Sequence, residues 1–348
     1  MSSPAPIVIG HRGASGYVPE HTLASYFLAI QYGADCVEPD LVMTRDGVLI
    51  ARHENELGGT TDVAAHWEFA SRRTTKSVDG TAVSGWFTED FTLRELKTLR
   101  ARERIPQLRP GNTRFDGQFE LATFEEVLAL VQGVDGQRAA RARQLGLSAP
   151  PPVGLYPEIK HASYFANLGL PMQAPLLALL GQYGYQGRDT RVWLQSFEVG
   201  YLKALRGMTR LPLVQLIEDR GAPFDFVLAG DARTYADLIT AQGLKEISHY
   251  AQAIGPAKSL VIPRHADGTL GLPTTLVADA HAAGLAVNPW TFRLENEFLP
   301  DDYRRGAAPA AAGDLQGELL AYLRAGIDGF FTDQADVGVS ARAAFLRG

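Results

Sequence analysis

Short apolar segments alternate with amphipathic segments along most of this 348-residue chain. The apolar segments predict buried strands at residues 7–9, 36–43, 155–159, 192–194, 213–217, 260–262, 285–289 and 329–332. Between many of them, apolar positions recur with helical spacing at residues 23–32, 124–132, 174–183, 199–206, 274–283 and 315–325. Because strands that alternate with helices form parallel sheets, and eight strands are predicted, the pattern favours a single α/β domain, a (β/α)8 TIM barrel.

Two polar stretches interrupt this alternation. Residues 57–119 are rich in Thr, Arg and Gly and show little periodicity. A stretch of that length in a compact domain is usually functional or a small subdomain. We therefore predict an inserted cap over the barrel mouth, after the second strand, within one domain that spans residues 7–346. Residues 133–152, which end in three consecutive prolines, predict an exposed connection.

Composition and charge narrow the classes of function. The formal net charge of −6 argues against the basic surface that nucleic-acid binding needs. No run of about 18 apolar residues predicts a transmembrane helix. Met1–Pro6 has neither a basic nor an apolar stretch, so the chain as written predicts no signal peptide. Cys36, the single cysteine, lies in an apolar run and is predicted to be a buried structural thiol.

The first candidate for chemistry is Gly10-His11-Arg12-Gly13, which directly follows the first predicted strand. Arginine binds phosphate through paired hydrogen bonds, and histidine transfers protons near neutral pH. The flanking glycines let a ligand approach the backbone closely. The segment therefore indicates chemistry on a phosphate ester, with a solvated loop as the alternative when it is taken alone.

Carboxylates in two later strands suggest a cation site. Glu38 and Asp40 lie two residues apart in a predicted strand, so they share one face. Like charges on a buried face need compensation, and a divalent cation with oxygen ligands is the simplest; two solvated acids are the alternative. Glu158 and Lys160 also share a face. We expect Glu158 to be a third metal ligand and Lys160 to offer a positive charge to phosphate, with a salt bridge between them as the alternative.

A second histidine is brought back by a predicted hairpin. Asp46-Gly47 is a hairpin turn signal. The returning strand would place His53 near the end of the first strand, opposite His11. Two histidines across one pocket suit a general acid and a general base; a structural histidine is the alternative when either is taken alone.

Two further strands contribute candidate substrate-binding residues. Gln195 offers an amide, and Trp290 offers either an apolar wall for a glycerol-like group or a core side chain. Asp333, after the last strand, would be either an acid behind the site or a helix cap. Six candidates lie at or just after the carboxyl ends of predicted strands, where (β/α)8 barrels place their catalytic residues: His11, Glu38, His53, Glu158, Gln195 and Trp290.

Taken together, these motifs resemble the glycerophosphodiester phosphodiesterase family, most closely its bacterial periplasmic branch. They span nearly the whole chain in the family's order: His11-Arg12-Gly13, Pro19-Glu20-His21-Thr22, residues 33–40, Thr44-Arg45-Asp46-Gly47, Arg52-His53, residues 157–160, Gln195-Ser196-Phe197, Pro289-Trp290-Thr291 and residues 329–333. Two positions depart from the usual family pattern. Glu54 stands where Asp is usual, and His21 stands where Asn is commoner.

The resemblance implies a TIM barrel with an inserted cap and one divalent cation, Ca2+ or Mg2+, bound by Glu38, Asp40 and Glu158. It also implies that His11 and His53 are the acid–base pair and that Arg12 and Lys160 hold the phosphate. The implied reaction is hydrolysis of small glycerophosphodiesters, such as glycerophosphocholine or glycerophosphoethanolamine, to an alcohol and sn-glycerol 3-phosphate.

Other readings stay open at this point. A phospholipase C or D of the same superfamily, acting on intact lipids, is the nearest alternative, and a non-catalytic phosphate-binding barrel is another. Neither a nucleic-acid partner nor stable membrane insertion is expected, and no motif indicates the oligomeric state. The resemblance implies a periplasmic location if a signal peptide has been removed, and a cytoplasmic one follows if the chain is complete as written.

Overall fold

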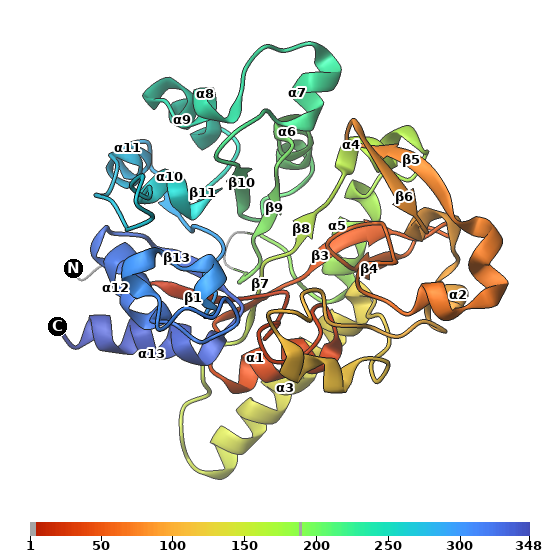
Figure 1. Ribbon diagram of the computed structural model, residues 1–348, viewed down its shortest axis with the longest axis horizontal. Coiled ribbons are helices and arrows are strands. Elements are labelled where there is room, and N and C mark those ends of the chain that lie inside the picture. The colour runs from red at the N-terminus through yellow and green to blue at the C-terminus, as the bar shows by residue number, and fades with distance from the viewer. Residues whose placement is uncertain (1–4, 188–189) are drawn as a thin grey trace.

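The computed structural model describes residues 5–187 and 190–348. Residues 1–4, part of the segment used to predict the absence of a signal peptide, lie outside this part. In the described chain, parallel strands form a barrel surrounded by helices (Figure 1). The barrel strands are β1 (Ile7–His11), β2 (Cys36–Glu38), β3 (Asp40–Met43), β7 (Gly154–Leu155), β8 (Glu158–Ile159), β9 (Leu194–Ser196), β10 (Leu213–Ile217), β11 (Ala253–Pro256), β12 (Ala286–Val287) and β13 (Gly329–Thr332).

Two of the barrel strands are each interrupted by a proline. β2 continues into β3 through Pro39, and β7 continues into β8 through Pro157. Proline has no N–H to give to the ladder. Its carbonyl still accepts, however, because Glu158 N donates to Pro39 O at 2.9 Å and Gln195 N donates to Pro157 O at 3.0 Å. Each interrupted pair therefore acts as one barrel strand, and the described residues supply eight strand positions.

These eight positions close into a ring. Their order is β1, β2/β3, β7/β8, β9, β10, β11, β12 and β13, with parallel pairing throughout. The last gap is closed by backbone hydrogen bonds: Asp328 N to Val287 O at 2.9 Å, Phe331 N to Pro289 O at 3.1 Å, and Phe292 N to Phe331 O at 2.8 Å. The predicted (β/α)8 barrel is confirmed.

Helices cover the outside of the ring (Figure 1). They are α1 (Leu23–Gln31), α3 (Phe124–Gln144), α4 (Ala162–Asn167), α5 (Gln173–Gln182), α6 (Val199–Met208), α7 (Phe224–Ala229), α8 (Tyr235–Leu238), α9 (Ala241–Ser248), α10 (Lys258–Val261), α11 (Leu276–Ala282), α12 (Leu315–Arg324) and α13 (Ala335–Leu346). Threonines cap two long ones, since the side chain of Thr22 accepts from Ser25 N at the start of α1 and that of Thr123 accepts from Glu126 N at the start of α3. Two 3-10 turns, Asn296–Phe298 and Asp301–Tyr303, lie between β12 and α12.

Two sequence predictions about these elements are wrong. The apolar run 260–262 is not a strand: its first residues end α10, and the strand is β11, seven residues earlier. A three-residue apolar run cannot distinguish a strand from a buried helical turn. Residues 133–152 are not all connection, because α3 continues to Gln144. The alanines, arginines and glutamines of this segment have high helix propensity, which outweighs the low propensity of the two glycines within it.

The stretch 57–119 contains its own small elements. β3 first pairs antiparallel with β4 (Leu49–Ala51), as the hairpin signal predicts. There follow a second hairpin, β5 (Thr74–Val78) with β6 (Thr81–Gly85), helix α2 (Leu93–Leu96), and 3-10 turns at Val63–Ala65, Trp67–Arg72, Thr88–Asp90 and Pro110–Phe115. The β5–β6 hairpin docks beside α4, where Asp79 binds His161 Nδ1 at 2.6 Å (Figure 1). The boundaries of a cap at 57–119, and of one domain at 7–346, stay predictions.

The barrel interior has an apolar layer directly beneath the candidate site. Side chains from six strands meet there: Ile9, Cys36, Tyr156, Val214, Ala253 and Phe331. Burial raises the pKa of the Cys36 thiol to about 12, which agrees with the prediction of a structural thiol. Since strand side chains alternate with period two, the next inward residues toward the carboxyl ends include His11, Glu38 and Glu158. The barrel geometry therefore places the candidate site on an apolar floor.

Candidate active site

The turn after β1 presents His11 and Arg12. Arg12 and Gly13 both have left-handed backbone, with φ of 57° and 88°. A Cβ on Gly13 would lie 2.5 Å from the carbonyl carbon of Ser25, so glycine is required there. The turn aims the Arg12 N–H at Glu38 Oε2, 2.8 Å away. The backbone at this position therefore links the end of β1 to the carboxylates of the neighbouring strand.

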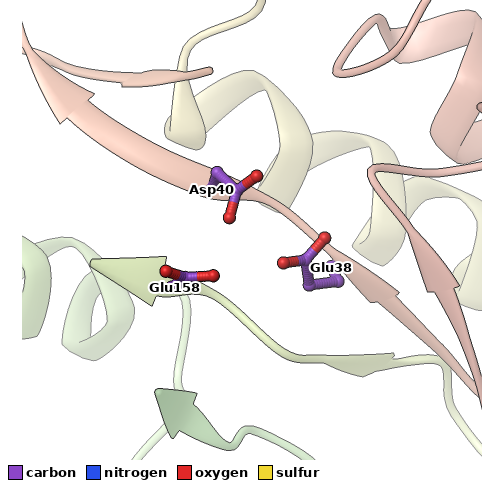
Figure 2. Close-up of side chains that lie close together, drawn as sticks. All are labelled: Glu38, Asp40 and Glu158. Carbon is purple, nitrogen blue, oxygen red and sulfur yellow. The ribbon is translucent and has the colours of Figure 1, made fainter. Parts of the chain in front are cut away.

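Three carboxylates from two neighbouring strands point toward a common space (Figure 2). Glu38, Asp40 and Glu158 each have an oxygen within 4.8 Å of the others, and their residues are 1%, 0% and 5% exposed. Among the described residues, Asp40 Oδ1 and Glu158 Oε1 accept no hydrogen bond, although Lys160 Nζ lies 3.5 and 2.6 Å from them. All three groups offer the hard oxygen ligands that Ca2+ and Mg2+ prefer. The cluster therefore fits a divalent cation.

The electrostatics of this cluster agree with that fit. Burial, together with repulsion by Asp40 and Glu158, holds the pKa of Glu38 well above its usual value. Burial raises the pKa of Glu158 to about 8, against the attraction of Lys160. Asp40 differs, because Lys160 and a hydrogen bond with His21 outweigh burial and hold its pKa well below the usual value. Three ionised carboxylates at this spacing thus need more positive charge than the neighbouring side chains supply.

Arg12 and Lys160 flank the carboxylates. Arg12 Nε lies 3.3 Å from Asp40 Oδ2, and Arg12 Nη1 lies 3.1 Å from Glu20 Oε2. Arg12 Nε is buried and donates no hydrogen bond within the described chain. Both cations are nine-tenths buried and line the same cavity as the carboxylates Glu38 and Glu158. Their position next to the cluster is accessible to an anion in this cavity, and their role in holding phosphate stays a prediction.

His11 is held by an acid from the far end of the chain. Its Nδ1 lies 2.6 Å from Asp333 Oδ1, so Nε2 is left to face the cavity, 3.5 Å from Thr291 Oγ1. Arg109 Nη2 donates to Asp333 at 2.6 Å, and Arg109 Nε donates to Glu295 at 2.5 Å. His11, Asp333 and Arg109 are therefore linked in series by these contacts. Of the two sequence readings of Asp333, the structure shows the acid behind the site.

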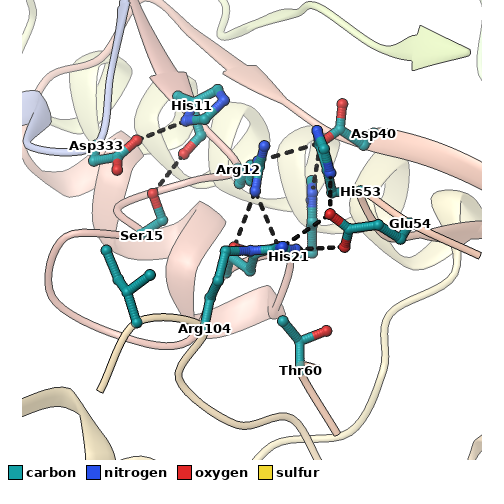
Figure 3. Close-up of polar contacts among 12 residues, drawn as sticks. His11, Arg12, Ser15, His21, Asp40, His53, Glu54, Thr60, Arg104 and Asp333 are labelled. Atoms are coloured by element: carbon teal, nitrogen blue, oxygen red, sulfur yellow. Dashed lines mark hydrogen bonds and ion pairs between the residues drawn. The ribbon is translucent and has the colours of Figure 1, made fainter. Parts of the chain in front are cut away.

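His53 is held in the same way (Figure 3). Its Nδ1 lies 2.5 Å from Glu54 Oε1, and Arg104 Nη2 donates to Glu54 at 2.7 Å. Arg104 also donates to Glu20 at 2.6 Å, and Glu20 binds Arg12. His53, Glu54 and Arg104 are therefore linked in series as well. The glutamate that departs from the family pattern thus supplies the carboxylate that contacts the histidine.

Both imidazoles line one cavity of about 480 Å3, together with Arg12, Lys160 and Trp290. Burial and the charge of Arg12 lower the pKa of His11 to about 4, against the pull of Asp333. Burial, Arg12 and Lys160 lower the pKa of His53 to about 3. Both rings are therefore neutral at pH 7 in the protein alone. A phosphodiester anion bound between them would favour protonation of either ring.

Gln195 and Trp290 also line this cavity. Gln195 Nε2 donates to Glu38 Oε1 at 3.3 Å, so the amide is turned toward the carboxylate cluster. Trp290 Nε1 donates to Gly255 O at 2.8 Å, and its ring packs edge to face with Phe197. Trp290 is half-buried, which agrees with a wall of the cavity rather than a core side chain. The structure thus brings every candidate residue to one end of the barrel.

Comparison with known proteins identifies the family. The model of the glycerophosphoryl diester phosphodiesterase family matches residues 11–337. This chain belongs to that family. It is 35% identical to glycerophosphodiester phosphodiesterase GDPD6 of Arabidopsis thaliana, over 96% of this chain and 85% of the relative. It is 30% identical to the glycerophosphodiester phosphodiesterase of Haemophilus influenzae, over 98% of this chain and 90% of the relative.

A solved structure supports the fold assignment. An Oleispira antarctica phosphodiesterase, determined in complex with the product sn-glycerol-3-phosphate, superimposes with a TM-score of 0.59 at 21% identity, covering 97% of this chain and 96% of that one. As a member of the glycerophosphoryl diester phosphodiesterase family, this chain is an enzyme that acts on a small glycerophosphodiester. In the described residues, no helix has the length and apolar character needed to cross a bilayer.

The sequence did not predict the residues that contact the candidate site residues from outside the cavity cluster. Arg104 and Arg109 lie in the stretch without periodicity, where nothing in the sequence indicates which carboxylate each residue would reach. Glu20 and His21 lie in a motif that was recognised but given no role, although His21 Nε2 lies 2.9 Å from Asp40 Oδ2. The Glu20-His21 pair next to a capping threonine was the available signal for an acid and an imidazole close to the site.

Proposed function

We propose that this protein hydrolyses glycerophosphodiesters such as glycerophosphocholine and glycerophosphoethanolamine to the free alcohol and sn-glycerol 3-phosphate. One observation carries the proposal: two carboxylate-held histidines, Arg12, Lys160 and two members of a buried three-carboxylate cluster, Glu38 and Glu158, all line one cavity. The product named for the Oleispira antarctica phosphodiesterase supports the same reaction.

The substrate phosphate would bind between Arg12 and Lys160. Glu38, Asp40 and Glu158 would hold a divalent cation, Ca2+ or Mg2+. When bound, such a cation neutralises charge on the phosphoryl oxygens and so favours the transition state. Arg12 Nε, which donates no hydrogen bond within the described chain, is available to a phosphate oxygen.

The two histidines would move the protons. One imidazole accepts a proton from the attacking oxygen, which forms a bond to phosphorus. The bond from phosphorus to the alcohol oxygen breaks, and the other imidazole gives that oxygen its proton. Asp333 and Glu54 fix the ring orientations through Nδ1, which leaves each Nε2 for the reaction. With water as the attacking oxygen, the products are the alcohol and glycerol 3-phosphate.

The test is release of sn-glycerol 3-phosphate from glycerophosphocholine, with and without a chelator and with Ca2+ or Mg2+ added back. His11→Ala and His53→Ala should each lower kcat by about 10²–10⁴-fold. His249→Ala is the matched control, because His249 is exposed and outside the cavity. Near-normal turnover in either cavity variant would refute the acid–base assignment. Head-group release from intact lipid vesicles, with no turnover of glycerophosphocholine, would instead favour the phospholipase alternative.

A further inference from the structure

A side groove opens from the catalytic cavity toward the inserted hairpin. It measures about 680 Å3 and shares His53, Glu158, Lys160, Phe197 and Glu218 with the catalytic cavity. Its rim is formed by Asp79–Thr81 at the tip of the β5–β6 hairpin and by the loop between β10 and α7. The two sides approach each other, because a Cβ on Gly80 would lie 3.6 Å from the Phe224 ring. A group bonded to the reacting phosphate can therefore extend past His53 into this groove.

Aromatic rings line the passage from the cavity to the groove. Phe197 packs edge to face with Trp290 on the cavity side, at 5.8 Å between ring centroids. On the groove side it packs in the same way with Tyr235, at 6.2 Å. The face of the Phe197 ring already lies 5.6 Å from an ammonium group, that of Lys160. The faces of these rings attract organic cations, because the negative part of the ring quadrupole lies there.

Glu218 adds a negative charge at the same place. It follows β10 directly, is partly buried and lines both spaces. No Lys, Arg or His of the described chain lies within ion-pair distance of its carboxylate. Burial and the neighbouring Asp219 raise the pKa of Glu218, and the charges of Lys160 and Arg220 oppose them. Glu218 and Tyr235 both line the side groove, and the charge of Glu218 contributes to the raised pKa of the Tyr235 phenol. The carboxylate therefore lies near the aromatic wall.

Basic side chains also line the catalytic cavity, and two of them are already paired. Lys258, Arg264 and Arg293 are among its lining residues. Lys258 pairs with the buried Glu318, and Arg293 pairs with the buried Asp333. Glu218 has no basic partner of this kind in the described chain. It therefore offers a negative charge to a positively charged alcohol in the side groove.

We propose that the side groove binds the alcohol part of the substrate and selects alcohols that carry a positive charge, such as choline and ethanolamine. Glu218 would oppose that charge, while Phe197 and Tyr235 contact its methyl or methylene groups. This inference rests on the proposed function and adds the class of leaving group to it. The uncharged glycerol half, which all these substrates share, would lie on the other side of the phosphate.

The experiment compares two diesters that differ in the charge of the leaving alcohol. kcat/KM is measured for glycerophosphocholine and for glycerophosphoglycerol in the wild type, in Glu218→Gln and in Glu297→Gln. Glu297 is exposed and lines neither space, so it is the matched control. We expect the ratio of kcat/KM for the choline diester over the glycerol diester to fall about tenfold in Glu218→Gln. The ratio should stay at the wild-type value in Glu297→Gln.

The dependence of this kcat/KM ratio on ionic strength is a second test of the charge of Glu218. In the wild type the ratio should fall as ionic strength rises, and in Glu218→Gln it should depend less on salt. An unchanged ratio in Glu218→Gln would overturn the inference, including the case where both substrates lose equally because Glu218 contacts the shared glycerol half. If the wild type turns over neither diester, the proposed function itself fails, and the inference fails with it.

Discussion

Arg104 offers a sharp test of whether the insertion takes part in catalysis. Its guanidinium binds Glu20 at 2.6 and 2.7 Å and Glu54 at 2.8 and 2.7 Å. Glu20 in turn binds Arg12, and Glu54 binds His53. Arg104→Gln removes the shared charge and leaves a shorter, polar side chain. Glu20 would then pair with Arg12 alone. Glu54 would still contact His53, but without the hydrogen bonds from Arg104 that now fix its position.

The structure sets the expected size of the effect. Removing one partner of a fully buried ion pair costs about 3–5 kcal/mol of stability. The side chains of Arg104 and Glu54 are 29% and 36% exposed, and Glu20 keeps Arg12 as a partner. We therefore expect a smaller loss in the free energy of unfolding, about 1–2 kcal/mol. The loss in kcat should be larger, about 100-fold. A displacement of a catalytic group by only about 1 Å is enough to lower kcat by that factor.

The assay pairs kcat and KM for glycerophosphocholine with urea denaturation of the same preparations. Arg104→Lys, which keeps the charge but cannot bridge two carboxylates with a planar fork, should recover part of kcat. Arg102→Gln is the control, because Arg102 is exposed and pairs with Asp116 at 3.7 Å. If Arg104→Gln loses stability as expected but keeps kcat within threefold, Arg104 is structural only and the reasoning fails.

Three further outcomes follow from the same structure. Arg293, Arg109 and His11 outweigh burial and hold the folded pKa of Asp333 well below its usual value, so its stabilisation is complete above about pH 4 and is lost as pH falls. Between pH 5 and 3, Asp333→Asn should therefore lose unfolding free energy less steeply than the wild type, and equal slopes would contradict this. Saturating Ca2+ or Mg2+ at 100 times Kd should stabilise the protein by about 2.7 kcal/mol, seen as a rise in Tm that Glu158→Gln removes; an equal rise in that variant would exclude the cluster as the site. Gly13→Ala should cost about 3 kcal/mol or more, since its Cβ would meet Ser25, whereas Gly47→Ala has open space and should cost about 1–2 kcal/mol for its left-handed backbone alone.

Much of the barrel could be predicted because strand and helix periodicities differ along the chain. The same period of two placed Glu38 with Asp40 on one face, and both point to the cluster in the structure. The position of β11 could not be predicted in this way, since Ala253-Ile254-Gly255-Pro256 is short and contains two residues that disfavour strands. Gly255 packs closely against the neighbouring strand, because a Cβ there would lie 2.6 Å from a methyl carbon of Leu216 and that side chain would have to shift. That constraint appears only once the ring is assembled.

The insertion was harder to predict for a different reason. A periodic element reveals which of its faces is buried, but Arg104 and Arg109 lie in irregular backbone, and their partners come from residues 20, 54, 295 and 333. Such contacts depend on how the insertion sits on the finished barrel. They leave no pattern in the local sequence, apart from an excess of arginine near the end of the stretch.

The two arginines make the insertion part of the catalytic scaffold rather than a removable lid. Asp333 and Glu295 are 2% and 6% exposed, and Arg109 is nine-tenths buried between them. A barrel without the insertion would leave Glu295 without its cationic partner and Asp333 with Arg293 and His11 alone. Burying an unpaired carboxylate is costly, so the loop that carries Glu295 would move. Since Asp333 contacts His11 and Glu54 contacts His53, loss of the insertion would disturb both histidines at once.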